Sequence, residues 1–217
     1  MTWLQMVDID RLAGFAFVAM IVIAVPGPSV LFVVSRGVAL GRRAAVITAI
    51  GNEAGMVVQV VAVALGLGAI VERSVVVFTV LKLMGACYLV FLGLQAIRHR
   101  ADLSLALGST VTTKGPLGTL REGFVVGLTN PKMIALFTAI LPQFVVWPQG
   151  DVSLQLLVLG LVAVAIALLS DSTWGILAGT ARSWLGRSPR RLQIMGGTAG
   201  IVMIGLGVRL AFSGRND

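Results

Sequence analysis

The sequence predicts an all-α membrane protein with six transmembrane helices. Hydrophobic residues make up 57% of the 217 residues, charged residues only 12%, and the mean hydropathy is +0.97. A soluble domain of this length could not bury so much apolar surface. Most of the apolar runs reach the roughly 20 residues that a membrane-spanning helix requires. The six runs are Leu12–Val34, Ala44–Val71, Val75–Ile97, Gly123–Val146, Val152–Ala181 and Leu192–Phe212.

The basic residues predict how the chain is oriented in the bilayer. The formal net charge is +8, but the Lys and Arg residues form short clusters between the apolar runs. This pattern favours the lipid bilayer over nucleic acid as the partner. The loops after the first, third and fifth runs carry eleven Lys and Arg residues, against four on the other side. By the positive-inside rule, these three loops are cytoplasmic and both termini lie outside.

The residue types that bind metals or cofactors are scarce. Cys87 is the only cysteine and His99 the only histidine, so the sequence predicts no metal site, no cofactor and no dithiol chemistry. An enzyme is not expected either, because no nucleophile stands beside a buried base. Two alternatives are a metal or inorganic-ion transporter, for which Glu53 and Asp171 would be the only deep carboxylates, and a structural membrane protein without transport.

The first apolar run is interrupted by Pro26-Gly27-Pro28, followed by Ser29. The prolines lack amide donors, and Gly27 can adopt backbone angles that other residues avoid. In lipid, a carbonyl freed in this way must be covered by protein or by a water-filled cavity. We therefore expect a broken helix at a binding site, with a simple kink as the alternative.

The fourth run contains a second break, Asn130-Pro131-Lys132. Asn130 can bond the carbonyls that Pro131 leaves open, or it can cap the helix that restarts there. A half-helix beginning at this point would direct its positive dipole end, and the ammonium of Lys132, at a carboxylate.

The chain reads as a single transmembrane domain, residues 1–217, made of two similar halves. Leu83-Met84-Gly85 in the third run matches Ile194-Met195-Gly196 in the sixth, and each half would hold three spans. Because three is an odd number, the second half must enter the membrane from the opposite side, which makes the halves inverted repeats. The repeats are about 12–97 and 123–212, and a cytoplasmic loop of about 98–122 joins them.

Apart from Arg209 near the end of the sixth run, four charged residues lie inside the runs: Glu53, Lys82, Lys132 and Asp171. Each costs ~2.5–3.5 kcal/mol at the centre of a membrane helix, so they are expected to pair or to line a cavity. Asp171 is the deepest and could accept a proton or hold a substrate amine, and an ion pair with Lys132 is the alternative. An amino acid carries both an ammonium and a carboxylate, so a site with Asp171 and Lys132 suits it. Lys82 lies nearer one face and is read as structural.

The second run contains a polar patch, Gly51-Asn52-Glu53-Ala54-Gly55. Glycines four residues apart allow two helices to pack closely, so we expect Gly51 and Gly55 to lie at a helix contact. Asn52 and Glu53 either face a cavity or support packing. Gln59 is read as an ordinary hydrogen-bond donor between helices.

Taken together, the motifs resemble those of the LysE/RhtB family of amino-acid exporters, from about residue 12 to residue 212. The resemblance implies an inner-membrane protein that exports a small amino acid of the threonine, homoserine or leucine sort by proton antiport, often as a homodimer. The motifs that carry it are Pro26-Gly27-Pro28, Ser35-Arg36-Gly37, Gly41-Arg42-Arg43, Leu81–Leu89, Asn130-Pro131-Lys132, Leu141-Pro142-Gln143-Phe144 and Gly205–Arg209.

The resemblance also assigns roles at the central site. The Pro-Gly-Pro and Asn130-Pro131 breaks would shape it, and Asp171 matches an acidic position common in the fifth span of the family. Lys132 would hold the substrate carboxylate or pair with Asp171. Two residues depart from the family pattern: Ser29 stands where asparagine is usual, and Glu53 is not a residue the resemblance predicts.

Overall fold

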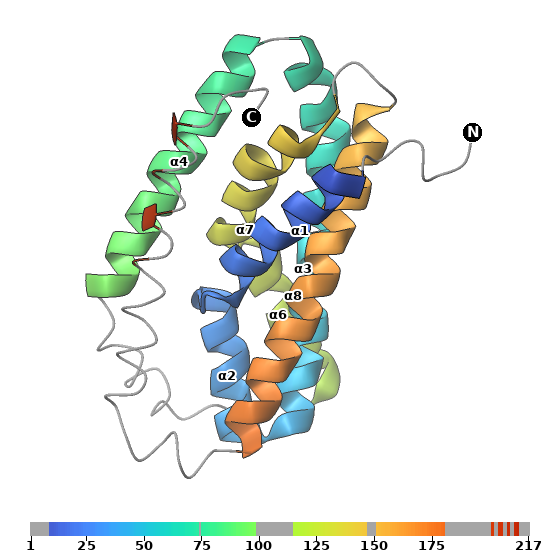
Figure 1. Ribbon diagram of the computed structural model, residues 1–217. Helices are drawn as coiled ribbons and strands as arrows, with labels where there is room; N and C mark the ends of the chain where they lie inside the picture. The colour runs from blue at the N-terminus through green and yellow to red at the C-terminus, as the bar shows by residue number, and fades with distance from the viewer. Residues whose placement is uncertain are drawn as a thin grey trace.

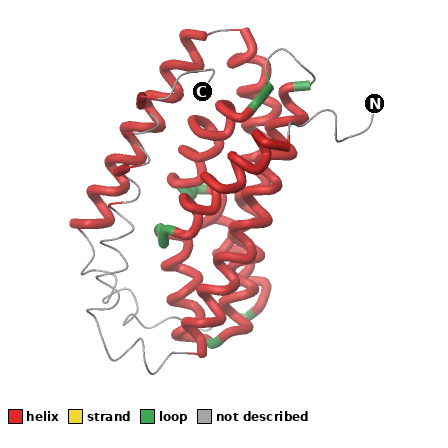
Figure 2. Tube along the Cα trace, in the orientation of Figure 1, coloured by secondary structure: helices red, strands yellow, loops and turns green. Residues whose placement is uncertain are grey.

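The computed structural model describes residues 9–73, 75–98, 115–146 and 151–180, together with positions 201, 204, 205, 208, 211 and 212. Every element in these segments is helical (Figure 2). The elements are α1 (Ile9–Ala24), α2 (Pro28–Leu40), α3 (Arg42–Arg73), α4 (Val75–Arg98), α6 (Pro116–Leu128), α7 (Pro131–Ala135), η2 (Leu136–Ile140), η3 (Leu141–Phe144) and α8 (Val152–Thr180).

The described helices coincide with the first five predicted runs. α3 and α8 are each long and apolar enough to cross a membrane. Two pairs of helices are long and apolar enough only when each pair is taken as one span: α1 and α2, bent by 53° at their break, and α6 with the helical segment from Pro131 to Phe144, bent by 41°. Both predicted breaks are therefore present. The sixth run, Leu192–Phe212, lies mostly outside the described residues.

The two bent spans run in opposite directions through the bundle (Figure 1). α1 and α2 descend in the view, whereas α6 and α7 ascend, and both breaks lie near mid-height. α3 and α8 pack against each other and against these spans, while α4 lies along the outside. The end of α2, the start of α3, the start of α6 and the end of α8 thus lie at the same end of the bundle.

Glycines set the close approach of α3 to α6. A Cβ added at Gly51 would meet the Leu120 carbonyl oxygen, and one added at Gly55 would meet that of Phe124. On the facing helix, a Cβ at Gly123 or Gly127 would collide with the backbone of α3. The predicted packing role of Gly51 and Gly55 is confirmed, because only a hydrogen atom fits at each position.

Most of the apolar core lies on one side of the breaks. A large buried cluster joins α1, α3, α8 and the segment from Pro131 to Phe144. Phe15 packs edge-on against Phe144 there, with ring centroids 5.5 Å apart. On the other side of the breaks, the buried apolar residues form two small groups. The groups are Val30, Val34 and Ala178, and Val33, Ala45 and Ala49.

Helical structure begins seven residues before the C-terminal end of the predicted loop of about 98–122. α6 begins at Pro116, with Gly115 as its N-cap residue and the proline at the first helical position. Proline is favourable there because its fixed φ suits the helix and it needs no amide partner. The polar residues that suggested a loop are accommodated in the first turns of α6, where Glu122 pairs with Arg36.

The inverted-repeat relationship stays a prediction. The matching motif in the last run, Ile194-Met195-Gly196, lies outside the described residues. The side chain of Lys82 is not described either, so its predicted structural role stays a prediction.

Candidate functional site

The two helix breaks meet through their side chains. The Asn130 amide nitrogen donates a hydrogen bond to the Ser29 hydroxyl oxygen at 2.9 Å. The Asn130 amide oxygen accepts from the Lys132 backbone N–H at 3.1 Å, which is the predicted N-cap of α7. Pro28 and Pro131 each stand in the first turn of the helix that restarts after the break. A proline thus starts each second half-helix, and Asn130 joins the two breaks.

Lys132 lies against the end of α1. Its side chain is buried, with 1% exposure, and its ammonium donates to the carbonyl oxygens of Val25 at 2.9 Å and Val22 at 3.4 Å. These carbonyls lack helical partners because the chain breaks at Pro26. A Cβ at Gly27 would lie 3.3–3.4 Å from the last three atoms of the lysine side chain. Gly27 therefore leaves the space through which Lys132 passes.

A second buried cluster joins α3 to α8. The Asn52 amide nitrogen donates to Glu53 Oε1 and to Asp171 Oδ2, each at 3.1 Å. All three side chains are buried. Two of their acceptor atoms, Asn52 Oδ1 and Glu53 Oε2, have no hydrogen-bond partner among the described residues. Buried acceptors without a partner are uncommon in proteins, and a bound water, ion or ligand is one way of satisfying them.

The Lys132 ammonium does not form the direct ion pair with Asp171 that was considered as an alternative. Within the described segments, its hydrogen bonds go to backbone carbonyls, and no ion pair joins it to Glu53 or Asp171. The three groups are still close enough to interact electrostatically. The site therefore holds an ammonium and two carboxylates on separate partners.

Gln59 has a more specific task than the sequence indicated. Its amide nitrogen donates to the Gly127 carbonyl oxygen at 3.0 Å and to that of Leu128 at 2.8 Å. Both carbonyls lie at the end of α6, where the helical ladder is interrupted, and the Gly127 carbonyl also accepts from the Asn130 N–H at 3.1 Å. The available signal was its spacing: Gln59 follows Asn52 by seven residues and so lies on the same face of α3.

All ten predicted site residues lie at or beside the two breaks. Ser29, Asn130 and Lys132 join the broken spans, and Asn52, Glu53 and Asp171 form the neighbouring cluster. Pro26, Gly27, Pro28 and Pro131 provide the broken backbone. In the part of the chain that is described, no group of three or more His, Cys, Asp or Glu residues could hold a metal ion.

This fold and site define a multi-pass membrane protein with two interrupted spans around a buried, charged centre. Comparison with known families gives the particular group. The model of the LysE type translocator family matches residues 20–214. The chain belongs to this family, as its motifs indicated.

Three curated relatives cover most of the chain. An uncharacterised membrane protein of Vibrio cholerae is 33% identical over 94% of this chain and 98% of its own. The homoserine/homoserine lactone efflux protein of Salmonella typhimurium is 29% identical over 86% and 88% of the two chains. The leucine efflux protein of Salmonella choleraesuis is 27% identical over 89% and 91%. No solved structure matches the chain.

Proposed function

We propose that this protein exports a small, uncharged amino acid across the bacterial inner membrane by proton antiport. The substrate binds between the two helix breaks, and a proton moves inward in exchange. The observation that carries the proposal is the separation of charges at the centre: Lys132 lies on carbonyls at one break, while Glu53 and Asp171 form a cluster with acceptor atoms left open.

An amino acid would complete both parts of this site. Its ammonium would bind the open acceptors, Asn52 Oδ1 and Glu53 Oε2, beside the Asp171 carboxylate. Its carboxylate would bind at the start of α7, where the helix dipole is positive and Lys132 lies. The net charge of one ammonium and two carboxylates favours an additional cationic group, which supports binding of the substrate amine or of a proton.

The names of the relatives support this substrate class. Homoserine and leucine are both uncharged amino acids of modest size, and the relatives that export them align over most of the chain. Export is a property of these relatives, and we extend it to this chain because the family match covers the spans that form the site. We further infer a transporter rather than an enzyme, since the family is one of translocators.

Proton coupling is assigned to Asp171. A carboxylate can gain and lose a proton as its access to water changes sides, and Asp171 is the acidic residue of α8 and is buried. Opposite directions of the two bent spans support alternating access by inverted halves. The arginine-bearing end of the bundle is cytoplasmic in this proposal, and the assembly is a homodimer.

The test is uptake of L-leucine, L-homoserine and L-threonine by inside-out membrane vesicles with an imposed proton gradient. We expect uptake of at least one of these amino acids by the wild-type protein, driven by the gradient. Asp171→Asn should abolish the dependence on the gradient. Asp151→Asn is the matched control, because Asp151 is exposed just before α8 and its Oδ1 accepts from the Leu154 N–H, a cap that asparagine preserves.

Two results would contradict the proposal. If Asp171→Asn transports with unchanged pH dependence, Asp171 does not carry the proton. If the wild-type protein transports none of the amino acids, even with the gradient, export of this substrate class is wrong. Transport of an inorganic cation in their place would favour the ion-transporter alternative.

A further inference from the structure

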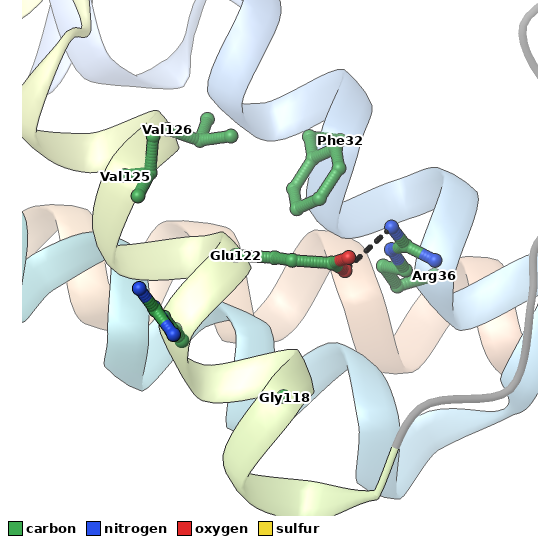
Figure 3. Close-up of a pocket in the computed structure, with 7 residues that line it drawn as sticks. Phe32, Arg36, Gly118, Glu122, Val125 and Val126 are labelled. Atoms are coloured by element: carbon green, nitrogen blue, oxygen red, sulfur yellow. Dashed lines mark hydrogen bonds and ion pairs between the residues drawn. The ribbon is translucent and has the colours of Figure 1, made fainter.

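A cavity of about 620 Å³ lies between α2 and α6. Figure 3 shows Phe32 and Arg36 on α2 facing Glu122, Val125 and Val126 on α6. α2 packs mainly on α8 and α3, and α6 packs mainly on α3, so the two helices contact each other only sparsely. The cavity is therefore a gap between the two broken spans.

The face of α2 that lines this gap continues to the central site. Ser29, Phe32 and Arg36 follow one another at spacings of three and four residues, so they lie on one face of α2. Ser29 stands at the inner end of this face, where it accepts the hydrogen bond from Asn130. Seven helical residues span about 10 Å. An amino acid bound beside Arg36 would thus be about two helical turns from the contact that joins the breaks.

The opposite side of the breaks is closed by the large apolar cluster. Phe15, Phe137 and Leu141 are fully buried in it. The hollow side is the one on which α2 ends and α6 begins, near the exposed Arg42 and Arg43. Among the described residues, the gap therefore lies toward the end that the positive-inside rule assigns to the cytoplasm, where an exporter collects its substrate.

The Arg36 guanidinium has donors to spare. Its Nη2 donates to Glu122 Oε2 at 2.8 Å, and its central carbon lies 4.7 Å from the centre of the Phe32 ring. Its Nε is buried and has no hydrogen-bond partner among the described residues. The bond to Glu122 uses one of the five N–H donors of the guanidinium, which are arranged to bind carboxylates in pairs.

The remaining lining selects the kind of ligand. Arg36 and Arg121 outnumber the one acid, Glu122, so the cavity favours a group with negative charge. Phe32, Val125 and Val126 form an apolar wall. A carboxylate attached to an uncharged side chain matches both parts of the lining, and a cationic amino acid does not.

We propose that this cavity is a loading pocket, in which Arg36 binds the carboxylate of an uncharged amino acid before the substrate moves to the central site. The proposal rests on the export function proposed above. Glu122 occupies Arg36 when the pocket is empty, and the incoming carboxylate displaces it. Glu122 is thus a competitor of the substrate, so substitutions of the two residues should change affinity in opposite directions.

The first test measures the half-saturating concentration of L-leucine, L-homoserine and L-threonine for uptake into inside-out vesicles. Arg36→Gln should raise it about tenfold, the change expected when a charge-assisted carboxylate contact is lost. Glu122→Gln should lower it, because the competitor is removed. Arg43→Gln is the matched control, since Arg43 is exposed at the start of α3 and does not line the cavity. If Arg36→Gln and Glu122→Gln weaken uptake alike, the pair only holds α2 to α6, and the loading pocket is wrong.

The second test does not depend on transport. Phenylglyoxal modification of Arg36 and Arg43 is followed by mass spectrometry of the whole protein's peptides, in native membranes of the Glu122→Gln variant. L-leucine should slow modification of Arg36 alone, and leucinamide, which lacks the carboxylate, should not. Equal rates with and without each of L-leucine, L-homoserine and L-threonine would overturn the loading pocket even if export is established. Protection that follows the content of anionic lipid, and not leucine, would mean that a lipid head group binds there, which also overturns it.

Discussion

The Lys132 ammonium lies 2.9 Å from the Val25 carbonyl oxygen, so a residue after the second break satisfies the backbone at the first. The end of α1 is the negative end of its helix dipole, and its last carbonyls have no helical donors. A buried ammonium both offsets the negative end of the dipole and donates hydrogen bonds to these carbonyls. The two broken spans are therefore coupled directly, so a change in the backbone at one break should alter the structure at the other.

Replacement of Lys132 by methionine tests this coupling. Lys132→Met preserves the length of the side chain but leaves the Val22 and Val25 carbonyls without their donor. We expect a loss of about 2 kcal/mol in the free energy of unfolding, the cost of buried acceptors left unpaired. Transport should be lost as well. Thermal unfolding of the purified protein and vesicle uptake measure the two effects separately.

Lys132→Arg is the matching control for charge. It keeps the positive charge, but its larger head group must pass Gly27, where a Cβ alone would come within 3.3 Å of the lysine side chain. We expect the free energy of unfolding of Lys132→Arg to lie between those of Lys132→Met and the wild type, and we expect little transport. Full transport by Lys132→Met would mean that the ammonium has no part in substrate binding or in joining the breaks.

The contact of α3 with α6 makes a second prediction. A Cβ at Gly127 would lie 2.8 Å from the Asn52 Cα and would collide with the Asn52 carbonyl, so one of the helices must move. Gly127→Ala should destabilise the protein by about 1–3 kcal/mol and disturb the Asn52 cluster. Gly66→Ala is the control on α3, because nothing lies within 4 Å of its added Cβ. The two variants are compared by the amount of folded protein that remains after detergent extraction. Equal yields of Gly127→Ala and Gly66→Ala would contradict the close contact.

The residues of this site whose structural roles could be predicted from the sequence are those that act on their own backbone. Proline and glycine act on their own backbone, so the breaks at Pro26 and Pro131 and the cap at Asn130 were readable locally. The partner of Lys132 was not, because charge alone pointed to Asp171, whereas the backbone carbonyls that it contacts leave no mark in the sequence.

Partners distant in the chain were also beyond local reasoning. Gly51 and Gly55 predicted a helix contact, but not that Gly123 and Gly127 would lie opposite them. Arg36 and Glu122 are 86 residues apart, and Glu122 was assigned to a loop because polar residues at the first turns of a span resemble loop residues. Such pairings depend on how the helices pack, which six similar apolar runs do not specify.

Gln59 gives a third prediction, which concerns the carbonyls at the end of α6. Gln59→Leu removes the donor to the Gly127 and Leu128 carbonyls while keeping a side chain of similar size. The loss should be about 1–2 kcal/mol, because the Leu128 carbonyl is left without this donor in an apolar surrounding, whereas the Gly127 carbonyl still accepts from the Asn130 N–H at 3.1 Å. Gln59→Glu removes the same donor and adds a charge, so it should be at least as harmful. Thermal unfolding measures both, and wild-type stability of Gln59→Leu would mean that water or lipid already reaches the break.

The last prediction separates the two buried acids. Glu53 accepts from Asn52 through Oε1 and leaves Oε2 open, whereas Asp171 contacts the same amide from the opposite helix. Glu53→Gln keeps the shape and removes one negative charge, so binding of a substrate ammonium should weaken by about fivefold, or about 1 kcal/mol, as a charged acceptor becomes neutral.

Proton coupling should survive Glu53→Gln because Asp171 is intact, and the pH dependence of uptake should match the wild type. Vesicle uptake measured over a range of substrate concentrations and pH values distinguishes weaker binding from lost coupling. If Glu53→Gln abolishes the response to the proton gradient as Asp171→Asn is expected to do, the two carboxylates share the proton through Asn52, and coupling belongs to the pair rather than to Asp171 alone.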